Sequence, residues 1–320
     1  MIKNFNRILL RILVMIILVF MLMGCINNKY VPHIKKWGIY SLDLYSQQID
    51  LIYSSIDEIT TLRLNNNGDQ FVFSMIINGT DYNNSEIFLL DHDGSNFIRL
   101  TKNHYWDLYP TWSPDDLKIA FLSYREDDLD IYIMNADGTN QSKFYDSGSH
   151  DADIHWINDT IVFTSGSKIW RINDDGTNPL VITNPPNAGE WGNANLPFGD
   201  YDPNIHPEGT KIAFERLEND NSIHGNYNIF SIKLDGSAEI RLTDTYFTQG
   251  FPTWSNSGEK ILLLVTAISD EGKYDFYMMN ADGSNYKNIT PDYFPDRFLC
   301  HSGVFSSDDL KIFFIGEWWE

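Results

Sequence analysis

Cysteine is scarce in this sequence, and the motifs of several enzyme classes are missing. The 320 residues include two cysteines, Cys25 and Cys300, too few for the disulfide framework of a small secreted domain. The cysteines and histidines do not show the spacing of a zinc site. A Gly-x-Ser-x-Gly segment is also missing, which argues against a serine hydrolase of the α/β type. The chain therefore offers no recognised catalytic motif.

Positive charge is the second deficit. Lysine and arginine number 23 against 44 aspartates and glutamates, which gives a formal net charge of −21. A field of this sign repels a phosphate backbone, so we expect no nucleic-acid partner. The alternative interpretation of the acids is that they simply keep an exported domain soluble. A hydrophobic content of 42% and an aromatic content of 14% argue against disorder, because burial of these residues can offset chain entropy.

The first 24 residues are typical of a signal peptide. Lys3, Arg7 and Arg11 precede an uninterrupted apolar run over residues 12–23. That run is short for a transmembrane helix and suits the apolar core of a signal. It ends in Leu-Met-Gly-Cys at residues 22–25, which resembles the lipobox of bacterial lipoproteins. The resemblance implies cleavage before Cys25 and attachment of diacylglycerol to its thiol. Loss of three cations and no acid lowers the net charge of the mature chain to about −24.

An acylated Cys25 would attach the mature chain to a lipid bilayer, with residues 25–36 as a tether. An uncleaved N-terminal anchor is the alternative. Both interpretations place the domain in the cell envelope, outside the cytoplasm. The anchored surface is either an outer membrane facing the periplasm or the cell surface.

Two kinds of strand pair alternate through the rest of the chain. The first kind has a turn followed by an apolar run such as KIAFLS or KIFFIG, and its turns fall at residues 67–68, 114–115, 158–159, 207–208, 257–258 and 308–309. The second kind has an Asp-Gly turn, which favours a hairpin because glycine adopts positive φ. These turns end at Gly94, Gly138, Gly176, Gly236 and Gly283. One pair of each kind predicts a four-stranded antiparallel blade.

The sixth blade requires strands from both ends of the chain. Six inner pairs are accompanied by five outer pairs, and the missing outer pair matches residues 38–44 and 48–53. Pairing of this segment with the last inner pair, residues 301–316, closes the ring and removes exposed sheet edges. The sequence therefore predicts an all-β fold, a six-bladed β-propeller over residues 37–320.

The repeat resembles that of a known family. The combination x-P-x-W-S-P-D-x-x-K-I-A-F with D-I-Y-x-M-N-x-D-G-[ST], seen over residues 109–139, resembles the WD40-like repeat (PD40) of the TolB β-propeller family. The resemblance covers nearly the whole chain from about residue 37 and is strongest in blades two and five. TolB itself has an additional N-terminal α/β domain, for which residues 25–37 leave no room. The resemblance therefore implies the fold and not the role of TolB in the Tol–Pal system.

One face of the ring should carry the variable connections. Both hairpin turns of a blade lie on one face, whereas the connections between second and third strands and between blades lie on the other. Binding residues usually lie on such loops. The most distinctive connection, residues 184–199, is rich in Pro, Gly and Asn and carries Trp191 and Phe198. These aromatic side chains suit a sugar ring or a protein partner. Alternatively, Trp191 folds back over the channel mouth.

Acids and histidines recur where the blades begin. They are Asp107, Asp151, Asp153, His155, Asp200, Asp202, His206 and His301. Because the innermost strands line the channel, several of these side chains could converge there. Three interpretations stay open: hydrogen bonding between neighbouring blades, a site for Ca²⁺ or Mg²⁺, and a catalytic acid–base or metal site. Strand alternation further predicts that Asp151, Asp153 and His155 share one face of their strand.

The preferred hypothesis is a monomeric, lipid-anchored, extracytoplasmic scaffold that binds an envelope protein or glycan through its loops, without catalysis. It requires no cofactor, although Ca²⁺ in the channel is one interpretation of the acids. The alternative is a polysaccharide lyase or hydrolase with a cation in the channel. Oligogalacturonate lyases have a related repeat, but they form a seven-bladed ring with metal-binding His and Gln residues. The six blades predicted here do not match that arrangement.

Overall fold

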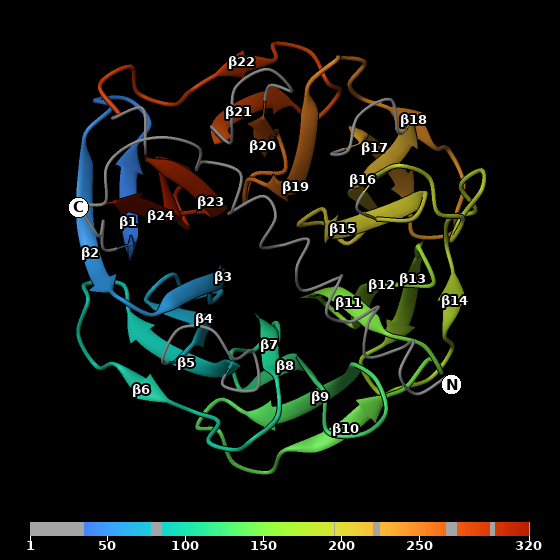
Figure 1. Cartoon of the computed structure of the whole chain (residues 1–320), viewed down its shortest axis with the longest axis horizontal. Helices are drawn as coiled ribbons and strands as arrows, with labels where there is room; N and C mark the ends of the chain where they lie inside the picture. Colours follow the sequence, from blue (N-terminus) through green and yellow to red (C-terminus); the bar gives the residue numbers. More distant parts are fainter. Residues whose placement is uncertain are drawn as a thin grey trace.

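The computed structural model describes residues 35–77, 85–194, 196–219, 225–266, 274–294 and 298–319. These residues form six four-stranded antiparallel sheets, arranged as blades around a central axis (Figure 1). The predicted six-bladed β-propeller is confirmed. Within the described ranges, no helix has the length and apolar character needed to cross a membrane. Cys25 and residues 26–34 of the predicted tether lie outside the described residues.

The first three blades follow one another along the chain, each with its innermost strand first. Blade 1 consists of β3 (Glu58–Leu64), β4 (Gln70–Ile76), β5 (Ser85–Asp91) and β6 (Ile98–Arg99). Blade 2 consists of β7 (Asp107–Trp112), β8 (Lys118–Ser123), β9 (Asp130–Asn135) and β10 (Ser142–Tyr145). Blade 3 consists of β11 (Asp151–Ile157), β12 (Thr160–Ser165), β13 (Lys168–Asn173) and β14 (Leu180–Val181).

The remaining blades complete the ring. Blade 4 consists of β15 (Gly199–Ile205), β16 (Lys211–Asn219), β17 (Asn226–Lys233) and β18 (Ile240–Arg241). Blade 5 consists of β19 (Thr248–Trp254), β20 (Lys260–Thr266), β21 (Tyr274–Asn280) and β22 (Lys287–Asn288). Blade 6 consists of β23 (Leu299–Phe305), β24 (Lys311–Trp319), β1 (Lys35–Asp43) and β2 (Ile49–Ser55). Four of the outermost strands have only two residues, which limits the exposed edges.

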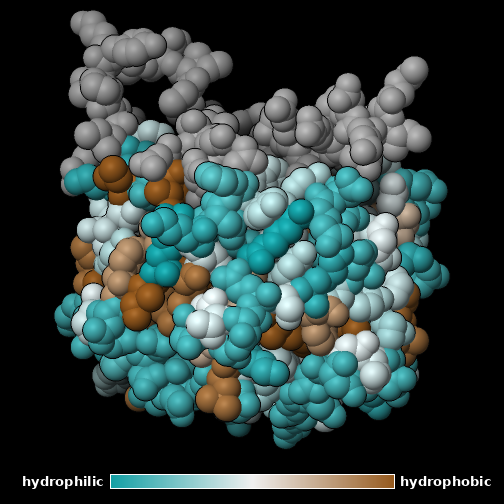
Figure 2. All heavy atoms as spheres, turned by 90° about the horizontal axis from the view of Figure 1, so that it is seen from below, coloured by the Kyte–Doolittle hydropathy of each residue, from teal (hydrophilic) through white to brown (hydrophobic). Residues whose placement is uncertain are grey.

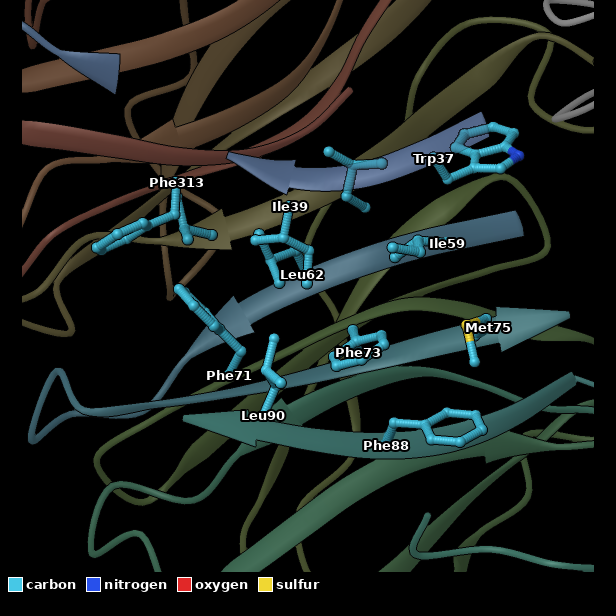
Figure 3. Packing of buried hydrophobic residues seen from close by; sticks show 12 residues of the cluster. Trp37, Ile39, Ile59, Leu62, Phe71, Phe73, Met75, Phe88, Leu90 and Phe313 are labelled. Atoms are coloured by element: carbon cyan, nitrogen blue, oxygen red, sulfur yellow. The ribbon is translucent and has the colours of Figure 1, made fainter. Parts of the chain in front are cut away.

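The ring closes through β1, as the sequence predicts. Strand β1 pairs with β24 along its whole length, from Lys35 opposite Trp319 to Asp43 opposite Lys311. Its buried side chains Trp37 and Ile39 pack toward blade 1 in one apolar cluster (Figure 3). Burial of one such side chain stabilises the fold by roughly 1.5–3 kcal/mol. Closure is therefore held by both a backbone ladder and a shared core.

Each junction between blades is filled by side chains of both neighbours. Trp112, Trp156 and Trp254, at or near the ends of innermost strands, lie in clusters that each contain residues of the preceding blade. A threonine after the outermost strand fixes the link to the next blade in four blades. Its hydroxyl accepts a hydrogen bond from a backbone N–H of the third strand, as in Thr101 to Ile87 and Thr243 to Ile229, both 2.9 Å. The tryptophan therefore repeats one structural role from blade to blade, packing at the junction, and the threonine repeats another, hydrogen bonding to the third strand.

The two faces of the ring differ in their connections. The two hairpin turns of every blade are joined by a backbone hydrogen bond, and we call this side the turn face; examples run from Ala136 N to Leu117 O and from Leu44 N to Leu310 O. The connections between second and third strands and between blades lie on the opposite side, the loop face. Strands β1 and β24 reach the loop face at Lys35 and Trp319. Both ends of the described ring therefore lie on the loop face.

Candidate functional site

An irregularity in each innermost strand shapes the central channel. The pairing between first and second strands shifts register in all six blades. In four blades a residue at this point has positive φ, between 49° and 55°: Tyr109, Asp153, Asp202 and Phe251. Such a bulge places two residues opposite one and turns a side chain away from the regular alternation. Residues from different blades are thereby directed to one place on the axis.

A small polar cavity lies where these strands meet. It is lined by residues of five blades: Arg63, Asp153, Asp202, Pro203, Asn204, Phe251, Pro252, Thr253, Ser302 and Gly303. Its volume of about 20 Å³ accommodates about one water molecule or a single ion. A sugar ring does not fit. Any larger ligand of this region therefore has to bind above the cavity, at the channel mouth.

Three buried acids and one arginine set the electrostatics of the channel. Burial raises the pKa of Asp202 well above its usual range, and the nearby Asp153 and Glu215 raise it further. Burial, reinforced by Asp153, also raises the pKa of Glu215 to about 8. Burial lowers the pKa of Arg63, which the charge of Asp202 opposes. At neutral pH the acids share protons, so the cluster carries less negative charge than its composition suggests.

The channel residues hydrogen-bond across blade junctions. Asp153 Oδ2 accepts a hydrogen bond from the backbone N–H of Asp202 at 3.3 Å. His155 Nδ1 accepts one from Ile205 N–H at 3.0 Å, and burial lowers the pKa of this imidazole to about 3. Of the three interpretations of the acids and histidines, the contacts of Asp153 and His155 match hydrogen bonding between neighbouring blades.

The next junction, between blades 4 and 5, follows the same pattern. Glu215 Oε2 accepts a hydrogen bond from Phe251 N–H at 3.1 Å. A Cβ atom at position 250 would lie 2.3 Å from this oxygen. Gly250 is therefore needed for the carboxylate to approach the backbone.

The other predicted acids and histidines do not join this cavity. Asp107 is buried at the loop-face end of β7 and pairs with Arg125 at 3.2 Å. Asp151 is buried in the same position of β11 and accepts a hydrogen bond from Ser147 Oγ at 2.5 Å. His301 Nε2 lies 3.1 Å from Glu317 Oε2. Of the predicted site residues, the structure brings Asp153 and Asp202 together, with His155 bonded to the adjacent strand.

The predicted alternation along β11 is wrong. The register shifts between Ala152 and His155, and Asp153 has a φ of 55°. As a result Asp151 bonds within its own blade, whereas Asp153 and His155 bond to blade 4. The three side chains do not form a common metal-binding face.

The lining of the cavity does not suit calcium. Arg63 brings a positive charge to the same cavity, and Asp153 Oδ2 is engaged by the N–H of Asp202, whereas Ca²⁺ requires several ionised or carbonyl oxygens. Among the described residues, the group with carboxylates close enough to share a metal is Glu126, Asp130 and Asp146, toward the loop face of blade 2. The ammonium of Lys143 lies 2.7–3.0 Å from an oxygen of each of these residues. A lysine side chain already supplies the positive charge there.

Sequence reasoning missed two residues of the channel, Arg63 and Glu215. Glu215 did leave a signal, because it occupies a position of the second strand where the equivalent run in blade 2 has Leu122. A charged residue in an apolar strand indicates a special environment. Arg63 gave no comparable signal, since an arginine at a strand end is common on protein surfaces.

The link between β14 and β15 forms a structured projection on the loop face. Gly189 N–H and Phe198 O are hydrogen-bonded at 2.9 Å, as are Phe198 N–H and Glu190 O. Phe198 is half-buried and packs on a cluster that contains Tyr201, so it is less available for binding than predicted. Trp191 is 47% exposed. The link therefore exposes the side chain of Trp191 on a backbone that is held by hydrogen bonds at its base.

Six four-stranded blades with repeated Asp-Gly turns define a β-propeller of the PD40 type. A family profile described as "TolB beta propeller domain" matches residues 30–257. The chain belongs to this TolB β-propeller domain family.

Several known proteins match part of the sequence, among them the following two. An uncharacterised protein of Agrobacterium fabrum, Atu1656, is 26% identical over 194 residues, which cover 56% of this chain and 61% of that protein. A "Protein TolB homolog" of Chlorobium luteolum is 27% identical over 49% of this chain and 33% of that protein. The matched segment thus covers about three fifths of the length of Atu1656 and one third of the length of the TolB homolog.

Solved structures support the fold. A putative TolB from Agrobacterium tumefaciens has a TM-score of 0.69 at 16% identity, covering 89% of this chain and 99% of that one. TolB from Acinetobacter baumannii has a TM-score of 0.60 at 16% identity over 78% of this chain and 61% of that one. An oligogalacturonate lyase in complex with manganese has a TM-score of 0.56 at 12% identity over 89% and 83%. At these identities the likeness concerns the fold alone.

Proposed function

We propose that the protein is a lipid-anchored scaffold of the cell envelope, outside the cytoplasm, that binds a protein or glycan through its loop face without catalysis. The observation that carries this proposal is the link between β14 and β15. Backbone hydrogen bonds fix its base, and Trp191 remains 47% exposed. An aromatic side chain on a pre-ordered backbone loses less conformational entropy on binding than one on a flexible loop, which suits a recognition site. The lipobox at residues 22–25 supports the anchor.

Two further observations favour binding over catalysis. The cavity of about 20 Å³ in the channel is too small for a saccharide. Asp153 of its lining, and Glu215 elsewhere in the channel, accept hydrogen bonds from the neighbouring blade. A partner is therefore expected on the loop face, around the channel mouth and outside the cavity. Membership of the TolB propeller family supports an envelope protein as this partner.

Substitution of the exposed tryptophan tests the proposal. We expect Trp191→Ala in the full chain to reduce crosslinking to an envelope partner by at least fivefold, without a change in melting temperature. Deletion of residues 185–195 should abolish capture. The matched control is Tyr45→Ala, an aromatic side chain 98% exposed on the turn face. Equal capture by the Trp191→Ala variant and the wild-type protein would place the binding surface elsewhere.

A polysaccharide-acting enzyme is the second candidate, favoured by the shared fold with the manganese-bound oligogalacturonate lyase. Incubation with acidic oligosaccharides and Mn²⁺, with and without chelator, distinguishes the two candidates. Release of unsaturated or hydrolysed products that stops with chelator would overturn the scaffold proposal. We expect no turnover.

A further inference from the structure

The predicted tether joins the ring on its loop face. The chain enters β1 at Lys35, which lies opposite Trp319 at that end of the closing blade. The ten residues from Ile26 to Lys35 span at most about 35 Å when fully extended. Strand β1 alone, residues 35–43, covers about 30 Å along the depth of the ring. With the turn face toward the membrane, the tether would have to run almost straight along the whole flank.

Exposed aromatic side chains surround the loop face. Tyr105 lies between β6 and β7, Tyr246 and Phe247 lie between β18 and β19, and Trp319 ends β24; together these four residues form what we call the aromatic rim. Their exposed fractions range from 38% for Trp319 to 91% for Tyr246. They come from the junction of blades 1 and 2, the junction of blades 4 and 5, and the end of β24 in blade 6, elements that lie apart around the ring (Figure 1). On the flank seen in Figure 2, by contrast, hydrophilic side chains dominate and apolar ones form separate small groups.

The distribution of the aromatic rim favours a flat surface over a protein epitope. Hot-spot residues of a protein interface cluster near its centre. The members of the aromatic rim instead lie at three separate places around the ring, with the polar channel between them. Tyrosine and tryptophan are enriched where one end of a side chain meets apolar chains and the other meets water, as at a bilayer surface. This spacing is what contact with a membrane plane requires.

Both faces carry acids, but the acids are paired differently. On the loop face, Lys143 lies 2.7 Å from Glu126 and 3.0 Å from Asp146, and Arg241 lies 2.8 Å from both Glu218 and Asp244. The outer turns of the turn face each expose an aspartate that hydrogen-bonds to a hydroxyl of its own turn: Asp93, Asp137, Asp175, Asp235 and Asp282. These hydrogen bonds lower the pKa of each of these carboxyls, so the five aspartates stay ionised at neutral pH. An anionic lipid surface repels that face.

We propose that the loop face is turned toward the bilayer and that the aromatic rim contacts the lipid headgroup region. The proposal rests on the lipid anchor of the proposed function and specifies how the anchored ring is held. Trp191 lies on the same face, on the link between blades 3 and 4 and apart from the rim residues, so its partner has to approach from the side of the ring, at the membrane surface. The turn face points away from the membrane, into the surrounding compartment.

Fluorescent labels on the two faces test this orientation. The full-length acylated protein is placed in phosphatidylcholine vesicles, with one new cysteine at Ser149 on the loop face or at Leu117 on the turn face; both positions are exposed. Cys300 is buried, and Cys25 is occupied by lipid, so the new thiol takes the label. We expect headgroup-attached quenchers to act at least twice as strongly on the Ser149 label. Equal quenching, or stronger quenching at Leu117, would overturn the orientation.

A second variant tests the aromatic rim itself. Tyr246→Ser with Phe247→Ser should reduce the quenching difference between the two labels by at least half, while the protein still sediments with vesicles. Tyr45→Ser on the turn face is the control and should change nothing. An unchanged difference in the double variant would show that the rim does not contact lipid.

Mass spectrometry of the membrane-extracted protein separates failure of this inference from failure of the proposed function. An unmodified Cys25 would overturn both the anchor and the orientation. A diacylated Cys25 with equally quenched labels would overturn the orientation and leave the anchored scaffold in place.

Discussion

The turn face and the loop face are built from the same strands but are stabilised differently. On the turn face, five of the six outer hairpins repeat one local arrangement, in which Asp137 Oδ1, for example, accepts hydrogen bonds from Thr139 N–H at 2.9 Å and Thr139 Oγ1 at 2.6 Å. On the loop face, Asp107, Asp151 and Asp200 are fully buried, and each has different partners. Asp200 binds Arg216, whereas Asp151 binds Ser147.

This difference has an energetic consequence. An exposed turn can lose one side-chain hydrogen bond to water at little cost. A buried carboxylate whose partner is removed keeps its desolvation penalty and has nothing to offset it. We therefore expect substitutions on the loop face to destabilise the ring far more than equivalent substitutions on the turn face.

The largest effect is expected for Arg216→Met. The guanidinium binds Asp200 through Nε at 2.6 Å and Nη2 at 2.9 Å, and it binds Glu239 through Nη1 at 2.8 Å. Its removal leaves Asp200 buried without its cation. The free energy of unfolding should fall by about 3–5 kcal/mol, measured by urea denaturation.

Two controls sharpen this prediction. Arg241→Met removes ion pairs to Glu218 and Asp244, neither of which is buried, and should cost no more than about 1 kcal/mol. Arg216→Met combined with Asp200→Leu should recover most of the loss, because no unpaired buried charge remains. Equal costs for the two single variants would contradict the contrast between buried and exposed pairs.

The second effect concerns the pH dependence of stability. The pKa of Glu215 is raised by burial to about 8, from an ordinary value of 4.5. The folded state therefore keeps a proton that the unfolded chain loses, so this group stabilises the fold most below pH 4.5. Its contribution falls as the pH rises toward 8, by up to about 1.4 kcal/mol per pH unit.

Glu215→Gln mimics the protonated carboxyl and keeps an oxygen for the N–H of Phe251. The variant should flatten the decline of melting temperature between pH 5 and pH 8. Burial also raises the pKa of Asp151 to about 7, so some slope remains. A pH profile identical to that of the wild-type protein would show that Glu215 is ionised in the folded state at neutral pH.

The repeated features of the fold were the ones that the sequence could predict. The Asp-Gly turns depend on local conformation, and closure of the ring by residues 38–53 followed from counting strand pairs. The bulges could not be predicted, because non-glycine residues such as Tyr109 and Phe251 give no local sign of a positive φ. Asp153 and Asp202 were selected as candidates, but their common cavity with Arg63 depends on packing between separate blades.

The third effect concerns hydrogen bonds of Asp309 on the turn face, which cross the junction between blades 5 and 6. Asp309 accepts hydrogen bonds from Asn256 N–H at 2.7 Å and Ser257 N–H at 2.8 Å, which join blades 5 and 6. Asp309→Asn removes the charge, keeps one acceptor and tolerates the φ of 59°. Unfolding free energy should fall by about 1 kcal/mol.

Asp116 makes the equivalent hydrogen bonds at another junction and provides the matched comparison for Asp309. It accepts hydrogen bonds from Asn66 N–H at 2.9 Å and Asn67 N–H at 3.0 Å across the junction of blades 1 and 2. Asp116→Asn should cost the same within a few tenths of a kcal/mol. A markedly larger cost for Asp309→Asn would indicate that the closing blade depends on the turn face more than the β1–β24 ladder suggests.

The smallest effect is expected for Asp137→Ala on an outer turn. The carboxylate is exposed and bonds only within its hairpin, where Gly138, with a φ of 83°, already sets the turn conformation. Hydrogen bonds from Thr139 lower the pKa of Asp137, so the wild-type advantage is present above the ordinary value of 3.8 and is lost as the pH falls through the lowered pKa. At pH 7 the melting temperature should change by no more than about 2 °C, and at pH 2 the two proteins should melt together. A loss at pH 7 as large as that of Arg216→Met would mean that the outer turns, like the loop-face ion pairs, are required for the ring to hold.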